Sequence, residues 1–132
     1  MKKFTSGEIR NVFINADNDT IVRRKNLRDF SKQHKIKYTI SQKYWLVDFD
    51  DFMKTVNPNG LMQSEKLPRL RSKITAQKEW NATHRRKIKH HIIDKACESG
   101  NVFVYKHGRK NIINYDELEK ELIRVLKEKG QY

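Results

Sequence analysis

The sequence has few residues that cross-link a chain, restrict its backbone or make it more flexible: one cysteine, two prolines and five glycines among 132 residues. The single cysteine, Cys97, cannot form an internal disulfide, which fits a reducing compartment. No apolar run approaches the roughly 20 residues of a membrane-spanning helix. The basic start Met1-Lys2-Lys3 is not followed by the apolar segment of a secretory signal. We therefore expect a cytoplasmic protein that does not cross a membrane.

Acidic residues are scarce relative to basic ones, with 16 Asp and Glu against 29 Lys and Arg, a formal net charge of +13 at pH 7. The excess is concentrated in residues 61–115, which carry 13 basic and 4 acidic side chains. This pattern predicts a polyanionic partner: nucleic acid first, an acidic protein second and an anionic membrane surface a distant third.

Catalytic and metal-binding motifs are also missing from the sequence. It has no phosphate-binding loop, nucleophile elbow or metalloprotease motif. The histidines and the cysteine lack the spacing of a zinc site: His84, His90, His91, Cys97 and His107. Helix capping accounts for the carboxylates around 48–51 and 116–117. The sequence therefore predicts a binding protein rather than an enzyme, with no metal and no cofactor.

The first half of the chain is predicted to form two helices, a hairpin and a third helix. Thr5 and Glu8 have the spacing of a capping box before a short amphipathic helix. A second helix is expected over 20–34, burying Leu27 and Phe30. Strands over 36–40 and 44–47 flank a short turn, and Asp48 caps a helix that ends before the turn residues 57–60.

The second half repeats this order after a linker over 58–72 without clear periodicity. A helix over 74–80, a turn over 81–83 and a longer helix over 83–99 are expected, with Gly100 just past its end. The apolar residues of the longer helix are Ile88, Ile92, Ile93 and Ala96. Strands over 102–106 and 112–113 flank the basic turn 107–110. Asn114 and Glu117 then have the spacing of a capping box.

An offset of 66 residues places the two halves in register. The stretch 44–52 then falls on 110–118, which aligns the caps Asp48 and Asn114. Leu27 falls on Ile93 and Ile36 on Val102, and a slip of one residue brings Phe13 onto Trp80. This self-similarity predicts two modules, 1–57 and 73–132, joined by the linker 58–72.

The order of helix–turn–helix, hairpin and a capped last helix resembles the excisionase-like and MerR-like winged-helix modules. The resemblance is carried by the small basic wing and strand over 106–114 and by the helix starts Asn114-Tyr115-Asp116-Glu117-Leu118 and Asp48-Phe49-Asp50-Asp51-Phe52. It covers 73–126 well and 5–56 more weakly, because the turn 41–43 lacks a glycine. The resemblance implies an α+β fold of two tandem winged helix-turn-helix modules. It also implies double-stranded DNA binding by a small transcription regulator or a recombination and architectural factor, associated with the nucleoid, from a phage or mobile element, with a recombinase as partner.

In a helix-turn-helix the second helix enters the major groove and the wing lies along the neighbouring backbone. The groove contacts predicted for the second module are Arg85, Arg86, Lys87 and His90. Arg109 and Lys110 of the basic turn are predicted to contact phosphates. In the first module the outward basic set is Lys25, Arg28 and Lys32. The alternative for all of these residues is an ordinary solvated surface.

Other functions remain open. A small basic protein of this kind can instead bind or inhibit an acidic host protein. Exposed aromatic residues such as Trp45 and Tyr38 would suit single-stranded nucleic acid, whereas Trp80 lies on an apolar helical face and is better explained as core. The last helix carries an apolar stripe that offers a homodimer surface: Leu118, Leu122, Val125 and Leu126.

Overall fold

The structure is a computed structural model that describes residues 3–22, 24–41, 44–57, 67–107 and 110–130. The chain divides into two compact units, Met1–Leu67 and Pro68–Tyr132, called unit 1 and unit 2 below. Together the described residues form six helices and two small three-stranded antiparallel sheets, an α+β architecture. None of these helices is long and apolar enough to cross a membrane.

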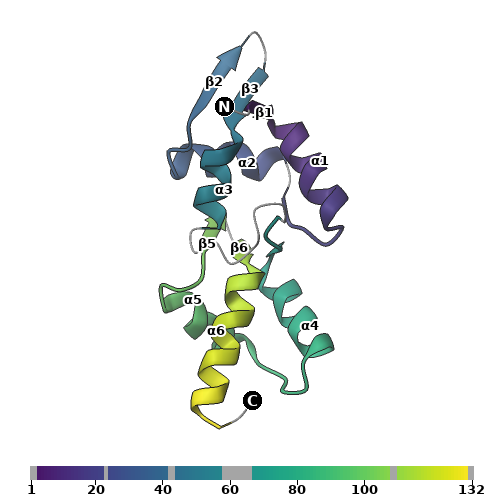
Figure 1. The fold of residues 1–132 in the computed structure, drawn as a ribbon, viewed down its shortest axis with the longest axis vertical. Helices are drawn as coiled ribbons and strands as arrows, with labels where there is room; N and C mark the ends of the chain where they lie inside the picture. The colour runs from purple at the N-terminus through teal and green to yellow at the C-terminus, as the bar shows by residue number, and fades with distance from the viewer. Residues whose placement is uncertain (1–2, 23, 42–43, 58–66, 108–109, 131–132) are drawn as a thin grey trace. The chain divides into compact units, whose positions relative to one another are not determined.

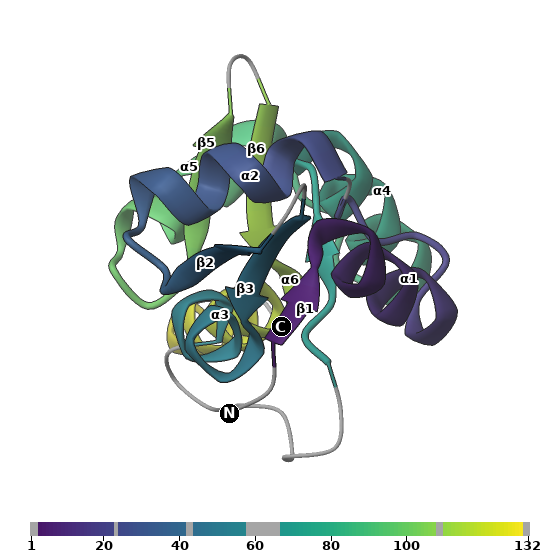
Figure 2. The ribbon, with the colours of Figure 1, turned by 90° about the horizontal axis from the view of Figure 1, so that it is seen from above.

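Unit 1 begins with a strand and ends with a helix (Figure 1). Its elements are β1 (Lys3–Thr5), α1 (Ser6–Ala16), α2 (Arg24–Gln33), β2 (Tyr38–Ser41), β3 (Tyr44–Asp48) and α3 (Phe49–Val56). The sheet has the order β1-β3-β2, so the strand that comes last in the sequence lies in the middle. Figure 2 shows β3 between its two neighbours in an end view of this unit.

Local sequence signals set the helix starts of unit 1. Thr5 Oγ1 accepts a hydrogen bond from the Glu8 N–H at 3.1 Å, and the Glu8 carboxylate accepts one from the Thr5 N–H at 3.0 Å. The predicted capping box is confirmed. The core is rich in phenylalanine, and Phe52 meets Phe13 and Phe30 edge to face at 5.8 and 5.5 Å between ring centroids, a favourable aromatic geometry. Leu27 and Phe30 are buried as predicted.

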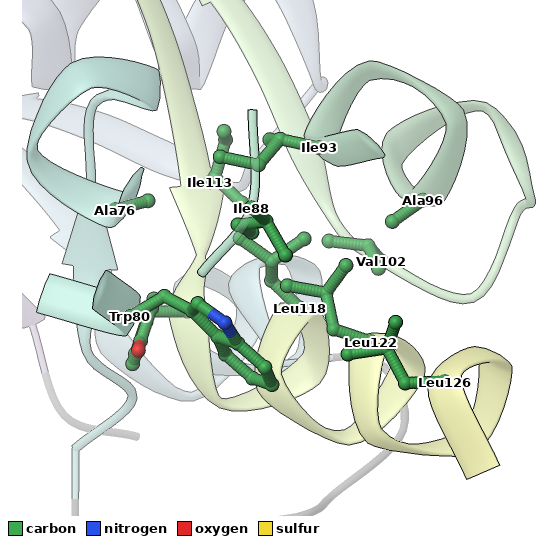
Figure 3. Packing of buried hydrophobic residues seen from close by; sticks show 11 residues of the cluster. Ala76, Trp80, Ile88, Ile93, Ala96, Val102, Ile113, Leu118, Leu122 and Leu126 are labelled. Carbon is green, nitrogen blue, oxygen red and sulfur yellow. The ribbon is translucent and has the colours of Figure 1, made fainter. Parts of the chain in front are cut away.

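Unit 2 has the same elements in the same order. They are β4 (Leu70–Arg71), α4 (Lys73–Thr83), α5 (His90–Glu98), β5 (Val104–His107), β6 (Lys110–Asn114) and α6 (Tyr115–Glu128), with sheet order β4-β6-β5. Side chains from α4, α5, β6 and α6 converge in one core (Figure 3). Trp80 is fully buried there, as predicted.

The two units repeat each other down to single hydrogen bonds. The Asp48 N–H donates to the Lys37 carbonyl at 2.9 Å, and 66 residues later the Asn114 N–H donates to the Phe103 carbonyl at 3.0 Å. Carboxylates tie the last helix to the same segment. Asp51 accepts a hydrogen bond from the Lys37 N–H at 2.8 Å and Glu117 from the Phe103 N–H at 2.7 Å. The paired core positions of the sequence repeat are buried in both units.

The structure corrects the helix boundaries expected in the second half. The turn expected over 81–83 is wrong because α4 continues through Thr83. The long helix expected over 83–99 is also wrong: α5 begins only at His90, and 84–89 form an irregular connection. Gly100 follows the helix with a φ of +85°, a left-handed conformation that glycine adopts readily.

Two further expectations fail on local detail. Leu70 and Arg71, near the end of the expected linker 58–72, form strand β4 and pair with β6. Residues 58–66 of that linker lie outside the described residues. The expected homodimer surface on the last helix is not available, because Leu118, Leu122 and Leu126 are all buried in the core of unit 2. Val125 is half-buried.

Candidate nucleic-acid interface

The connection between α4 and α5 carries a group of exposed cations. Arg85, Arg86, Lys87 and Lys89 are all exposed, whereas Ile88 among them is buried. No carboxylate of the described residues pairs with any of the four. We call residues 84–89 the basic connection.

Three side chains from one face of α4 fix the backbone of the basic connection. Residues 77, 80 and 81 lie on the same face because they are three and four positions apart. The Trp80 indole N–H donates to the Arg86 carbonyl at 2.6 Å. The Asn81 side-chain oxygen accepts from the Ile88 N–H at 2.9 Å, and the Gln77 amide donates to the Ile88 carbonyl at 3.0 Å. The connection therefore has a defined course although it is neither helix nor strand.

His84 occupies the joint where α4 passes into the basic connection. Its ring stacks on the Trp80 indole with 3.6 Å between ring centroids and 5° between planes. Its Nε2 lies 3.1 Å from a Glu119 carboxylate oxygen, an ion pair when the ring is protonated. These contacts join the start of the connection to both α4 and α6.

The first turn of α5 continues the positive region. The N-cap residue Lys89 makes no side-chain capping hydrogen bond, and the next two residues, His90 and His91, are exposed. The start of a helix carries partial positive charge and unpaired N–H groups. Further along α5 the charge is mixed, since Asp94 pairs with Lys73 at 3.0 Å. Cationic character is thus concentrated at the N-terminal end of α5.

Two arginines at the start of unit 2 contact three carboxylates of α4 and α6. Arg69 contacts Asp116 at 2.7 Å, Glu79 at 3.1 Å and Glu119 at 3.2 Å. Burial would lower the pKa of Arg69, but the hydrogen bond to Asp116 and the surrounding carboxylates outweigh it and raise that pKa. Arg71, almost fully buried, contacts Glu79 at 2.8 Å. These three carboxylates therefore contact Arg69, Arg71 and His84, and none of them pairs with Arg85, Arg86, Lys87 or Lys89.

A further group of polar residues lines a cavity of about 510 Å³ next to α5. Cys97 lies in its wall, and burial raises the pKa of this thiol to about 11. A thiol with so high a pKa is neutral near pH 7 and is a poor nucleophile. The residues that line the cavity are Lys73, Asp94, Cys97, Glu98, Val104, Lys106 and Asn111. Across the part of the chain that the structure describes, no three His, Cys, Asp or Glu side chains form a group suited to a metal ion.

The residues predicted to contact nucleic acid are placed as follows. Arg85, Arg86 and Lys87 lie in the basic connection, not on a helix, and His90 is the first residue of α5. Lys32 is exposed in the last turn of α2. The remaining predicted residues are known only in part. Lys25 and Arg28 lie on α2 and Lys110 on β6, but their side chains and all of Arg109 lie outside the described residues.

No family model, no curated protein and no solved structure matches this chain.

The structure adds two cations that the sequence analysis did not select. Lys89 belongs to the basic connection, and Lys106 is exposed on β5 of the hairpin. Lys89 had a usable signal, since in the run Arg85-Arg86-Lys87-Ile88-Lys89 only Ile88 is apolar. Lys106 could have been found from the alternation of strand β5, in which Tyr105 points inward.

In the part of unit 1 that the structure describes, the corresponding link carries no basic side chain. The described part of the link between α1 and α2 is 17–22, where Asp17 and Asp19 supply negative charge. Thr20 and Val22 are buried, and Val22 takes the place that Ile88 has in unit 2. The candidate interface is therefore a property of unit 2 and not of the repeated fold.

Proposed function

We propose that the chain binds double-stranded DNA as a small transcription regulator or a recombination and architectural factor, with no catalytic role. The observation that carries the proposal is the uncompensated basic connection, which leads directly into the uncapped start of α5. Cations and helix N-termini are both favourable partners for phosphate. The +13 net charge of the whole chain supports the same partner.

The element order and the sheet order support a winged helix-turn-helix in each unit. In this proposal α4 and α5 are the two helices, and the hairpin of β5 and β6, with Lys106 exposed, is the wing. Because Arg85, Arg86 and Lys87 precede α5, we assign them to phosphates and not to base edges. His90 and His91 begin the helix that would enter the groove. Phosphate contacts fix the position of a protein on DNA, whereas base contacts supply specificity.

The test is fluorescence anisotropy with a mixed-sequence duplex, a single strand and an RNA, each titrated over a range of KCl concentrations. If about six phosphates are neutralised, log K for the duplex falls against log salt with a slope of about −5. Preference for the duplex over both other ligands is expected. A slope near zero on duplex DNA would contradict the proposal despite the high net charge.

Single substitutions test whether the cations of the basic connection produce the slope of log K against log salt. Arg86→Ala is expected to lower its magnitude by about one unit on any duplex sequence, as the loss of one phosphate contact does. The matched control is Lys120→Ala, which removes an exposed cation from α6 and is expected to leave the slope unchanged. Equal effects of the two variants would show a dispersed charge effect in place of a defined site.

A second candidate function, binding or inhibiting an acidic host protein, is favoured by one observation in unit 1. Strand β2 lies at the edge of its sheet, and on it Tyr38 and Ile40 are 44% and 67% exposed. Exposed apolar residues on an edge strand suit pairing with another chain. This candidate expects Ile40→Lys to abolish a stoichiometric complex with an acidic protein. It also expects weak duplex binding with no sequence preference.

A further inference from the structure

We propose that Asn81 is a positioning residue of the DNA-binding surface, which holds the basic connection in its binding conformation before DNA arrives. The inference rests on the proposed function, since it assigns a role to a residue that touches no DNA. It concerns the side-chain hydrogen bonds from α4 to the connection, called the α4 clamp and made by Gln77, Trp80 and Asn81.

Within the clamp, Asn81 contacts both the backbone N–H and the backbone carbonyl of a single residue, Ile88. Its side-chain oxygen accepts from the Ile88 N–H at 2.9 Å, and its side-chain amide lies 3.4 Å from the Ile88 carbonyl as a donor. Gln77 donates to the same carbonyl at 3.0 Å. The Ile88 side chain is 5% exposed and is part of the core of unit 2. Residue 88 is therefore fixed through its backbone and its side chain together.

The fixed residue lies between the cations that the proposed function uses. Lys87 and Lys89 are the two neighbours of Ile88 in the chain, and both are exposed. Arg86 is held separately, because its carbonyl accepts from the Trp80 indole N–H at 2.6 Å. Ordering one backbone residue costs about 1–2 kcal/mol. Because folding already orders residue 88 in this structure, DNA binding does not have to supply the free energy of ordering it.

The fold itself does not require the clamp, as unit 1 demonstrates. Helix α1 corresponds to α4 with an offset of 67, which places Arg10, Phe13 and Ile14 where Gln77, Trp80 and Asn81 stand. Phe13 and Ile14 have no polar side-chain group with which to hold a backbone. Unit 1 nevertheless buries Val22 at the position of Ile88. The clamp therefore accompanies the basic charge of the connection and not the architecture.

The experiment compares Asn81→Ala with the wild-type full chain in the anisotropy assay on duplex DNA. The variant is expected to bind roughly 5- to 30-fold more weakly, the effect of releasing one backbone residue. The slope of log K against log salt is expected to stay the same, because every cation remains. Arg86→Ala is the matched contrast, since it reduces the slope. Hydrogen exchange without DNA is expected to show faster exchange of the Ile88 amide in Asn81→Ala.

Three outcomes would overturn the inference in distinguishable ways. If Asn81→Ala stays folded and exchanges faster at Ile88 but binds duplex as wild type does, the positioning role is wrong and the proposed function stands. If its affinity and its salt slope both fall, the variant has lost phosphate contacts, and the ordering of residue 88 alone does not account for the role of Asn81. If wild type binds no duplex, both proposals fail. Should Asn81→Ala unfold, Gln77→Ala removes one clamp bond and is expected to show a smaller loss of affinity at constant slope; unchanged affinity would reject the clamp.

Discussion

Unit 1 and unit 2 arrange the same elements in the same order, yet they carry their charge on different elements. The link between the first two helices is acidic in unit 1, with Asp17 and Asp19, and basic in unit 2. On the second helix the pattern reverses. Positions 28 and 32 of α2 are basic, whereas the equivalent positions of α5 hold Asp94 and Glu98. The comparison teaches that this fold fixes backbone and core but leaves the position of the charged surface free.

A second difference lies where the first strand meets the last helix. In unit 1 Phe4 contacts Phe49 edge to face, with 5.0 Å between ring centroids. In unit 2 the position of Phe4 is taken by Arg71, and the Arg69 guanidinium lies 4.7 Å from the ring centroid of Tyr115. One unit closes this junction with aromatic packing and the other with an ion-pair network. The contact between the first strand and the last helix can therefore be made by aromatic packing or by ion pairs.

The largest effect is expected from the equivalent core aromatics Phe13 and Trp80. Trp80→Ala should cost about 3–5 kcal/mol of unfolding free energy, because it empties a fully buried site. If each unit has its own core, hydrogen exchange will show loss of protection in unit 2 while unit 1 stays protected. Phe13→Ala is the reciprocal control and should affect unit 1. Loss of protection throughout the chain in either variant would show that the units unfold as one.

A smaller effect is expected when the unit 2 junction is broken or replaced by that of unit 1. Arg71→Ala should destabilise unit 2 by roughly 2–3 kcal/mol, below the ~3–5 kcal/mol of a fully buried pair, because Glu79 keeps some contact with water. The double variant Arg71→Phe with Glu79→Val installs the residues of unit 1 at these positions. Its stability should lie within about 1.5 kcal/mol of wild type, since well-packed apolar residues often replace a buried ion pair at little cost.

Thermal and urea unfolding of Arg71→Phe, Glu79→Val and the double variant measure this coupling. If the double variant is as unstable as the sum of the two single variants, the two junctions are not interchangeable.

The smallest effect in free energy comes from exchanging the charge of the connection. Arg85→Asp with Arg86→Thr gives unit 2 the residues of unit 1 at positions 19 and 20. We expect duplex binding to weaken by about 1–2 kcal/mol and the salt slope to fall by about two units, because two phosphate contacts are lost. Circular dichroism should be unchanged, since both side chains are exposed. An unchanged duplex affinity would remove the connection from the interface, whatever the rest of the chain binds.

Much of this fold was predictable because its signals are local or periodic. The Thr5 capping box, the capping residues Asp48 and Asn114, and the glycine after α5 need only neighbouring residues. The repeat was found by aligning apolar residues with apolar residues and caps with caps. Both halves bury the same positions of the repeat. Agreement between the two halves therefore strengthened helix and strand assignments that either half alone would support only weakly.

The boundaries that failed depend on contacts between distant residues. The spacing of Ile88, Ile92 and Ile93 is compatible with one long helix, and nothing local ends it. The connection is instead set by Trp80 and Asn81, whose hydrogen bonds to the backbone at 86 and 88 replace helical ones. Strands β1 and β4 are short, and each pairs with a strand more than forty residues later. Most cations of the candidate interface could therefore be selected from the sequence, but the backbone conformation that carries them could not.

The central position of β3 and β6 has a consequence for the order in which the protein is assembled during translation. Strand β1 has no partner until the ribosome has released β3, because Lys3 pairs with Asp48. Strand β4 waits likewise for β6, since Leu70 pairs with Asn114. Such distant pairings slow folding because a long loop must close first. We expect unit 1 to complete its sheet while unit 2 is still being synthesised. The hydrophobic residues of the nascent chain are then buried one unit at a time.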